Sequence, residues 1–342
     1  MPRRPPGEFE LIDLVTRLLP VRGEGVAVGP GDDAAVLRPP AGEELVATVD
    51  AVVEGVHFDR RFAPEEIGWK ALAVNLSDLA AMGARPLWAL VALAFPPGTP
   101  AARVRGVARG LGACARAHRI AVAGGNVTRA AELSVTVTAV GAVPAGRALL
   151  RSGARAGDLV VATGTFGDAA LGRRPRAPRA LVERQRRPTP RLAAGRALAP
   201  FARAAVDVSD GLVQDLDHLC AASGVGARIG AAEVPLSPAY RALAGRARLG
   251  LAPALSGGED YELLLAIAPA LLPSARAAAR RARTPITVLG RFVRGRGVAV
   301  IGEDGAPLAA GPGHDHLRTP GAVAAAGRVL ISRGRRLGSR RR

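Results

Sequence analysis

Four short acidic segments, spread over residues 31–263, constrain this chain more than any other feature of its sequence. They are GDDAA (31–35), NLSDL (75–79), DVSDGL (207–212) and SGGEDYEL (256–263). Each sets carboxylates beside small or apolar residues, whereas a merely solvated surface mixes carboxylates with other polar groups. Mg²⁺ takes such oxygen ligands and completes its shell with water and substrate phosphates. Asp, Ser and Gly also supply helix caps and turns. One segment alone would favour that structural interpretation, but four favour a metal site.

Length and charge narrow the class of protein. A chain of 342 residues suits two domains better than one core. The formal net charge of +18 would ordinarily indicate binding to nucleic acid or a membrane surface. However, Lys70 is the only lysine, the Arg residues are scattered among Ala, Gly and Pro, and aromatic residues make up only 3% of the chain. No aromatic side chains alternate with Arg to stack on bases. The charge therefore predicts a solvated surface, and nucleic acid is not an expected partner.

The cysteines and the apolar segments indicate the cellular compartment in which the protein is expected. Cys114 and Cys220 stand apart with no metal-ligand spacing, which fits a reducing cytosol without a disulfide framework. The first residues lack the apolar core of a signal peptide. No stretch approaches the ~20 apolar residues that a membrane span needs. We therefore expect a cytoplasmic protein that does not associate with a membrane.

Local patterns predict strands and helices that alternate without a strict βαβ rhythm. The predicted strands are 44–53, 120–123, 133–143, 158–163, 204–208, 262–267 and 286–289, and the predicted helices are 64–82, 104–117, 212–222 and 271–283. The 120–123 strand is expected to end at Gly124-Gly125. Residues 173–190, crowded with Arg and Pro, are expected to be an exposed connection. Ser209 and Asp210 are expected to cap the helix that follows them.

The motifs that are missing from the sequence also limit the chemistry. The chain has no P-loop, no protein-kinase set, no dinucleotide fingerprint, no nucleophile elbow and no HExxH zinc motif. An acid-rich site without a lysine-bearing phosphate loop implies that metals, backbone amides and an Arg manage phosphate charge. That combination is typical of phosphoryl transfer achieved by positioning and electrostatics.

Taken together, the ordered motifs resemble the thiamine-monophosphate kinase family, which belongs to the aminoimidazole ribonucleotide synthetase-like ATP-binding superfamily. The resemblance covers residues 7–317. The motifs that carry it are GDDAAVL, the strand that ends at Asp50, GVHF, KALAVNLSDLAAMGARP, GGN, GRALLRSGARAGD, DVSDGL and LSGGEDYEL. Of these, KALAVNLSDLAAMGA and LSGGEDYEL together are the most specific.

The resemblance implies a fold, a reaction and a set of partners. The implied fold is α/β of the α+β type, with two domains like those of aminoimidazole ribonucleotide synthetase and a homodimer formed through the N-terminal domains. We place the domains at residues 1–144 and 145–318, followed by a basic tail, 319–342, expected to be disordered. The implied reaction converts ATP and thiamine monophosphate to ADP and thiamine diphosphate, with several Mg²⁺ ions and ATP as co-substrate. Direct in-line transfer needs no catalytic nucleophile or general base.

The resemblance also implies roles for individual residues. Asp33, Thr48, Asp50, Asp78, Asp207 and Asp210 match metal ligands; Gly125, Arg151 and Ser209 match ATP contacts; His57 and Glu259 match contacts of thiamine monophosphate. Several have a specific structural alternative: His57 as a structural histidine, Glu259 as a turn residue, and Arg151 as a surface arginine. For Asp78 that alternative is weakest, because a carboxylate on an Ala- and Leu-rich helix needs a partner.

Three positions depart from the pattern of the family. Val49 stands where the family has a hydroxyl residue, Asn126 replaces an Asp, and Leu317 occupies the place of an aromatic that covers the thiamine. Two other functions remain open. The chain could be another enzyme of the superfamily that acts on a different acceptor, or a basic protein with a decayed site that binds nucleotides or nucleic acid.

Overall fold

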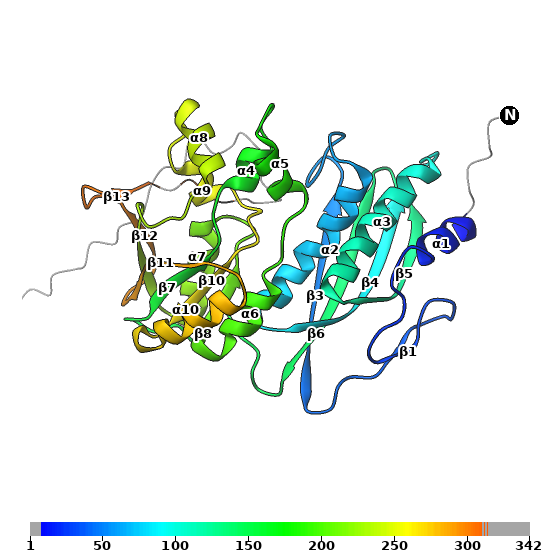
Figure 1. Cartoon of the computed structure of the whole chain (residues 1–342), viewed down its shortest axis with the longest axis horizontal. Helices are drawn as coiled ribbons and strands as arrows, with labels where there is room; N and C mark the ends of the chain where they lie inside the picture. The colour runs from blue at the N-terminus through cyan, green and yellow to red at the C-terminus, as the bar shows by residue number, and fades with distance from the viewer. Residues whose placement is uncertain (1–7, 310, 312, 314–342) are drawn as a thin grey trace, which may run out of the picture.

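The computed structural model describes residues 8–309, 311 and 313, and its N-terminal part is built on a four-stranded sheet (Figure 1). The strand order is β3-β6-β4-β5, with β4 and β5 parallel and the other neighbours antiparallel. These strands are β3 (Glu43–Val53), β4 (Arg85–Phe95), β5 (Ala121–Arg129) and β6 (Ser134–Pro144). Helices α2 (Pro64–Ala81) and α3 (Ala101–His118) pack against one another and cover one face of this sheet (Figure 1).

Smaller elements complete this part of the molecule. Helix α1 (Glu8–Thr16) packs on α3 and β5. Strands β1 (Val26–Val28) and β2 (Val36–Leu37) pair with each other, and their side chains pack on Leu87, Trp88 and Ala121.

The C-terminal part contains a seven-stranded sheet in the order β13-β12-β9-β11-β7-β10-β8. Only the β12–β9 pair is parallel among these described strands. The strands are β7 (Leu159–Thr163), β8 (Ala202–Asp207), β9 (Gly226–Gly230), β10 (Leu263–Ile267), β11 (Ile286–Val293), β12 (Gly297–Ile301) and β13 (Pro307–Leu308). The helices are α4 (Asp168–Gly172), α5 (Arg179–Arg186), α6 (Leu192–Leu198), α7 (Leu212–Ser223), α8 (Pro238–Arg246), α9 (Ala252–Ser256) and α10 (Leu272–Arg281). Two 3₁₀ turns are η1 (Ala199–Phe201) and η2 (Pro269–Leu271).

Both faces of the C-terminal sheet are buried, in two different cores. On β10, Leu263 and Leu265 join a cluster that includes Leu76 of α2 and Leu198 of α6, whereas Leu264 joins a cluster with residues of α7. Successive side chains of a strand point to opposite faces, which explains the division. One core therefore runs continuously from the N-terminal part into the C-terminal part and fixes their relative position.

A close helix crossing tightens this junction. Gly195 of α6 lies so near α2 that an added Cβ would approach the carbonyl oxygen of Ala80 to 2.0 Å. Only glycine allows this approach, so α2 is enclosed by the sheet, α3 and α6. Lys70, Asn75 and Ser77 of α2 are consequently fully buried although they are polar. Buried polar groups require partners, and two of these three residues contact residues of the cavity described below.

The predicted strands and helices are confirmed, with three corrections. Strand β5 does not end at Gly124-Gly125 but continues to Arg129, because parallel pairing with β4 extends it. Residues 173–190 are not simply exposed, since they contain α5, in which Leu181 and Gln185 are buried. Asp215, not Ser209 or Asp210, satisfies the start of α7: its Oδ2 accepts the backbone N–H groups of residues 209, 210 and 211 at 2.9–3.1 Å.

Other expectations stay predictions. The chain passes from one sheet to the other between β6 and β7, but the domain limits at 144 and 318 stay predictions. Leu317 and the tail 319–342 fall outside the described residues. Among the described helices, none has the length and apolar character required to cross a membrane.

Candidate active site

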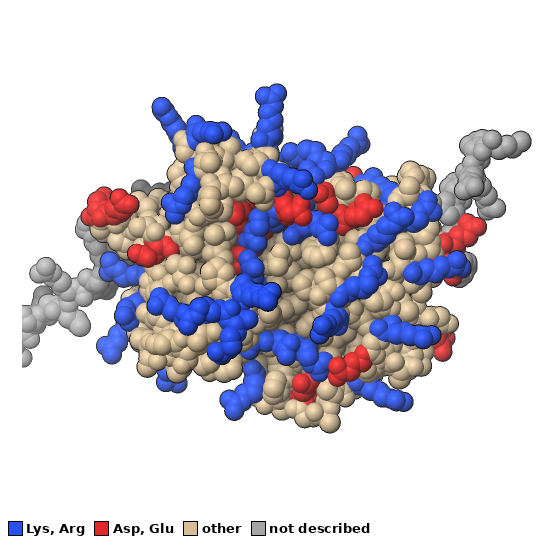
Figure 2. Space-filling view, viewed as in Figure 1, with Lys and Arg blue, Asp and Glu red and all other residues tan. Residues whose placement is uncertain are grey.

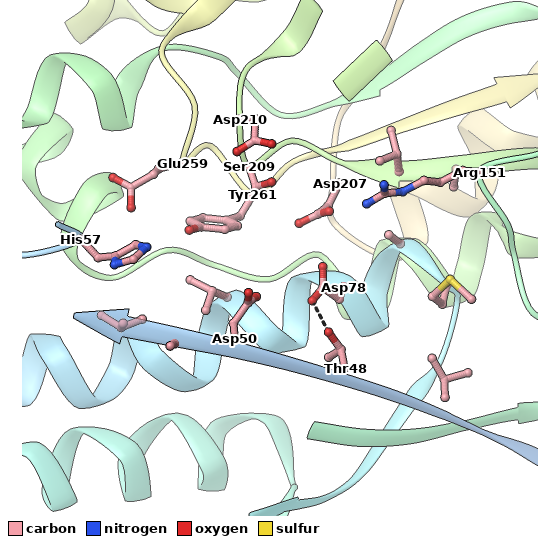
Figure 3. Close-up of a pocket in the computed structure, with 18 of the residues that line it drawn as sticks. Thr48, Asp50, His57, Asp78, Arg151, Asp207, Ser209, Asp210, Glu259 and Tyr261 are labelled. Atoms are coloured by element: carbon pink, nitrogen blue, oxygen red, sulfur yellow. Dashed lines mark hydrogen bonds between the residues drawn. The ribbon is translucent and has the colours of Figure 1, made fainter. Parts of the chain in front are cut away.

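A cavity of about 480 Å³ lies where the two parts of the molecule meet. Nine of the predicted site residues line it (Figure 3): Thr48, Asp50, His57, Asp78, Arg151, Asp207, Ser209, Asp210 and Glu259. They come from β3 and the loop after it, α2, the connection between β6 and β7, β8, and the turns that precede α7 and β10. Segments far apart in the sequence therefore contribute to a single site.

One end of the cavity is acidic, and its N-terminal half is built by β3 and α2. Thr48 and Asp50 are two apart on β3, so their side chains lie on the same face of the strand. Thr48 Oγ1 donates a hydrogen bond of 2.6 Å to Asp78 Oδ2 of α2 (Figure 3). This bond fixes the orientation of the Asp78 carboxylate and leaves its other oxygen for a ligand.

The C-terminal half of the acidic end is built by β8 and the turn after it. Asp207 ends β8, and its Oδ2 accepts a hydrogen bond of 2.7 Å from Ser77 Oγ of α2. Asp210 follows in the turn before α7, where Gln214 Nε2 donates to its Oδ2 at 3.3 Å. The Ser77–Asp207 contact ties the two halves of the site together directly.

The acidic end carries more negative than positive charge. Burial, together with the charges of Asp78 and Asp210, raises the pKa of Asp50 to about 6. Burial and the charge of Asp78 raise the pKa of Asp207 to about 8. Burial also raises the pKa of Asp78, against the opposing effects of the Thr48 hydrogen bond and Arg151. These carboxylates repel one another, which favours either protonation or a bound cation.

The donor set fits a hard divalent cation. Four carboxylates and the Thr48 hydroxyl offer only oxygen atoms, which are the ligands that Mg²⁺ prefers. Asp210, Asp215 and His218 also place possible ligand atoms within 4.8 Å of one another. However, Asp215 Oδ2 is occupied by three backbone N–H groups. We therefore assign Asp215 to the turn and not to a metal.

The other end of the cavity contains His57 and Glu259, and here the carboxylate is compensated. The Nδ1 atom of His57 accepts the N–H of Val53 at 3.2 Å, so a neutral ring carries its proton on Nε2. Glu259 forms ion pairs with Lys70 and Arg173. Burial alone would raise the pKa of Glu259, but the charges of Lys70 and Arg173 outweigh it and lower the pKa below its usual value.

The turn that carries Glu259 is strained and firmly held. Glu259 and Tyr261 have φ values of 61° and 51°, in the left-handed region that non-glycine residues rarely occupy. Gly258 passes so close to Ser209 that an added Cβ would lie 2.5 Å from the Ser209 carbonyl oxygen. The backbone N–H of Glu259 donates to that same oxygen at 2.7 Å. Strain maintained in this way is typical of functional sites.

Two predicted residues lie outside the cavity lining. Asp33 is exposed, and its N–H donates to Asp32 Oδ1 at 2.8 Å. Gly125 lies within β5, where an added Cβ would meet the carbonyl oxygen of Val91 at 2.0 Å, so the pairing of β4 and β5 accounts for this glycine. Asn126 is exposed on the same strand. The roles of Asp33 and Gly125 stay predictions.

Three residues of the site were not predicted from the sequence. Tyr261 and Arg173 line the cavity, and Lys70 forms an ion pair with Glu259 from outside the lining. Tyr261 lies within the GGEDYEL motif, and Lys70 is the only lysine of the chain, so both carried a signal. Arg173 lies in an Arg-rich segment and carried none.

Comparison with known proteins identifies relatives over most of the chain. Residues 31–143 match the family described as AIR synthase related protein, N-terminal domain, and residues 155–303 match its C-terminal domain. The thiamine-monophosphate kinase of Caulobacter vibrioides is 39% identical over 308 residues, which is 86% of each chain.

Solved structures agree with the sequence relatives. The crystal structure of thiamine-monophosphate kinase from Stenotrophomonas maltophilia K279a has a TM-score of 0.79 and 42% identity, covering 87% of this chain and 96% of that one. AaThiL, solved in complex with AMPPCP and TMP, has a TM-score of 0.71 and 33% identity, covering 90% of this chain and 97% of that one. The chain therefore belongs to the thiamine-monophosphate kinase family, among the AIR synthase related proteins.

Proposed function

We propose that this chain transfers the terminal phosphoryl group of ATP to thiamine monophosphate, which yields thiamine diphosphate and ADP. The observation that carries the proposal is one cavity with two unlike ends. An acidic end suits cations and polyphosphate, and a compensated end around His57 and Glu259 suits an organic acceptor. The relatives named thiamine-monophosphate kinase, and the related ThiL structure solved with AMPPCP and TMP, support this assignment.

At the acidic end, the side chains divide the work of handling phosphate charge. Asp50, Asp78, Asp207 and Asp210, with the Thr48 hydroxyl, would hold Mg²⁺, which when bound neutralises the charge of the polyphosphate. Arg151 lines the same cavity and points toward it (Figure 3). Its planar guanidinium can bind two phosphate oxygens at once. Ser209 lies beside Asp210 and supplies a hydroxyl for the nucleotide.

At the other end, the residues bind and orient without taking a proton. An acceptor phosphate oxygen is already ionised near neutral pH, so direct attack on ATP needs no strong general base. His57 presents a donor on Nε2 when it is neutral, and Glu259 presents an anion. Cys220 lies outside the cavity lining, and burial raises the pKa of its thiol to about 12, so it is not a nucleophile here.

One assay tests the proposal. Purified protein, Mg-ATP and thiamine monophosphate should form thiamine diphosphate and ADP in equal amounts, as followed by chromatography. Thiamine and sugar phosphates serve as alternative acceptors: turnover with one of these, and none with thiamine monophosphate, would identify a different enzyme of the superfamily. Protein labelled by ³²P-ATP in the absence of acceptor would contradict direct transfer.

We also infer that the chain forms a homodimer through its N-terminal sheet. The face opposite α2 and α3 exposes Val49 (60%) and Leu90 (40%), and Thr138 pairs with both of them in register. Large apolar side chains exposed near one another on an uncovered sheet face favour association. Light scattering should give the mass of a dimer for the wild type and a lower mass for Val49→Glu. A monomeric wild type at micromolar concentration would contradict this inference.

The alternative of nucleic-acid binding finds less support. Figure 2 shows Lys and Arg spread over the whole visible face rather than gathered in one stripe. Many of the arginines are committed to ion pairs, among them Arg184, Arg186 and Arg191. Steep salt dependence of DNA binding without ATP turnover would favour that alternative.

A further inference from the structure

Lys70 is an exception in the composition of this chain. The sequence contains 47 Lys and Arg residues, and Lys70 is the only lysine among them. Its side chain is fully buried in α2, where a charge is costly unless it is paired. All the remaining Lys and Arg positions of the chain carry Arg, whereas among the described residues the fully buried position carries Lys. This site therefore has a requirement that Arg does not meet.

The contacts of the ammonium group explain the requirement. Lys70 Nζ donates to the carbonyl oxygen of His57 at 3.2 Å and forms an ion pair with Glu259 Oε1. It also lies 5.6 Å from the centre of the Phe62 ring. A compact ammonium with three N–H donors can serve three directions at once, whereas the planar guanidinium of Arg is larger and fixed in shape. The guanidinium of Arg186 lies 5.1 Å from the centre of the same ring, so this ring already contacts one guanidinium.

The two cations on Glu259 differ in their relation to the cavity. The side chain of Arg173 is 40% exposed and lines the cavity, whereas Lys70 is fully buried and does not line it. Lys70 therefore holds the carboxylate from behind, on the side away from any ligand. Arg173 approaches from the cavity side, where a ligand group that binds Glu259 would replace it.

Lys70 also connects the two halves of the acceptor end. His57 follows β3 in the N-terminal part, and Glu259 precedes β10 in the C-terminal part. Glu259 occupies a left-handed backbone conformation, with φ at 61°, that needs support from its surroundings. A single ammonium group contacts both residues, so it fixes their spacing.

We propose that Lys70 is a positioning residue for the acceptor site: it holds the Glu259 carboxylate and the His57 segment at the spacing that recognises a nitrogen heterocycle with hydrogen-bond donors. This role rests on the proposed function, because Lys70 acts through the two residues assigned to the acceptor and touches no substrate itself. It concerns recognition of the acceptor and not the handling of ATP.

The first experiment separates the two substrates. Lys70→Met keeps the length and burial of the side chain but removes the charge. We expect the KM for thiamine monophosphate to rise about ten- to a hundredfold, which is the loss expected for a charged contact that is no longer oriented. The KM for ATP and kcat should change less than about threefold. Equal changes in both KM values would overturn the proposal.

Two control variants test the route of the effect. Arg173→Met also removes one cation from Glu259, but from the exposed side, and should change the acceptor KM less than Lys70→Met does. In a Glu259→Gln background, Lys70→Met should add less than about a twofold change, because the group that it positions is already altered. Independent, multiplying effects of the two substitutions would contradict action through Glu259.

This double-mutant comparison remains informative if Lys70→Met unfolds the protein because Glu259 loses its buried cation and keeps the partly exposed Arg173. The double variant Lys70→Met/Glu259→Gln carries no buried unpaired charge and is then compared with Glu259→Gln alone. Equal acceptor KM values support the proposal, and a further rise in the double variant overturns it. Failure of the proposed function is distinct, because then the wild type itself forms no thiamine diphosphate.

Discussion

The two ends of the cavity treat buried carboxylates in opposite ways. Asp207 and Glu259 line the same cavity, and both are nearly fully buried. Asp207 is surrounded by other carboxylates, and its pKa is raised to about 8. Glu259 lies between Lys70 and Arg173, and its pKa is lowered. The residue types are alike, so the charges of the neighbours decide the difference.

This difference in charge explains how one cavity could serve the two unlike ligands of the proposed reaction, a metal-bound polyphosphate and an organic acceptor. An uncompensated group of carboxylates is stabilised when a cation arrives, so that end is ready for metal and polyphosphate. A compensated carboxylate is a permanent anion that can accept hydrogen bonds from an organic ligand. Glu262, just beyond the turn, extends the compensated region, because Arg184, Arg191 and Thr163 all bind it.

The largest expected effect tests the uncompensated end. Asp78→Asn should lower kcat on the order of a hundredfold or more, because it removes one charged ligand from the centre of the acidic group. Thermal stability without divalent cation should not fall, since one of several repelling charges is lost. Asp13→Asn, on an exposed residue of α1, is the control and should change neither quantity. Unchanged turnover at limiting Mg²⁺ would remove Asp78 from the metal site.

A substitution at the compensated end should lower the free energy of unfolding. Glu262→Gln removes the buried anion that binds both Arg184 and Arg191, and leaves Arg184 only its longer 4.0 Å pair with Asp168. We expect the free energy of unfolding to fall by ~3 kcal/mol. Glu183→Gln on α5, whose partner Arg187 is exposed, should change it by less than ~0.5 kcal/mol. Urea denaturation measures the free energy of unfolding of both variants. Equal effects would show that the buried ion pairs stabilise the fold no more than an exposed pair does.

The turn between the two ends provides a smaller test. Asp215→Asn weakens three hydrogen bonds to the backbone N–H groups of residues 209–211 and should lower the free energy of unfolding by ~1 kcal/mol. Asp210→Asn should leave stability nearly unchanged but reduce kcat, because Asp210 is assigned to metal and not to the cap. If Asp210→Asn instead lowered stability and Asp215→Asn lowered kcat, Asp210 would be the capping residue and Asp215 the metal ligand.

The smallest expected effect concerns pH. In the folded protein the pKa of Asp207 is about 8, above the ~3.9 of an unfolded Asp. The folded state therefore binds the extra proton between these values, and stability without divalent cation should fall as pH rises from 6 to 8.5. Mg²⁺ should raise the melting temperature by a few degrees more at pH 8.5 than at pH 6. A magnesium effect independent of pH in thermal denaturation would contradict the electrostatic account, and Asp207→Asn should flatten the profile.

Much of the fold was predictable from local pattern. Alternation on β3 and the long helical pattern of α2 both appear in the structure at nearly the expected residues. The errors arose where tertiary contacts override local preference. An Arg- and Pro-rich segment became α5 because Glu262 and Glu66 pair with its arginines. Two glycines did not end β5 because β4 pairs alongside them.

The candidate site was predictable in its residues but not in its electrostatics. Motifs containing Asp78, Asp207 and Glu259 stood out as acidic groups in apolar settings, and all three residues line one cavity. Asp33 and Gly125 matched the family equally well and lie outside that lining. Nothing in the sequence distinguished these two cases, because the position of a motif in the chain does not state what packs around it.

The sequence by itself determined which family the chain resembles and which side chains are candidates for the chemistry, since both reside in short ordered motifs. Only the tertiary structure decided which carboxylates stay uncompensated and which are neutralised. Lys70 and Glu259 lie in different halves of the chain and form an ion pair only after both halves have packed around α2. Electrostatic interactions depend on distance in space and on burial, not on separation along the chain. Two acidic motifs of similar appearance therefore acquire opposite roles in the folded protein.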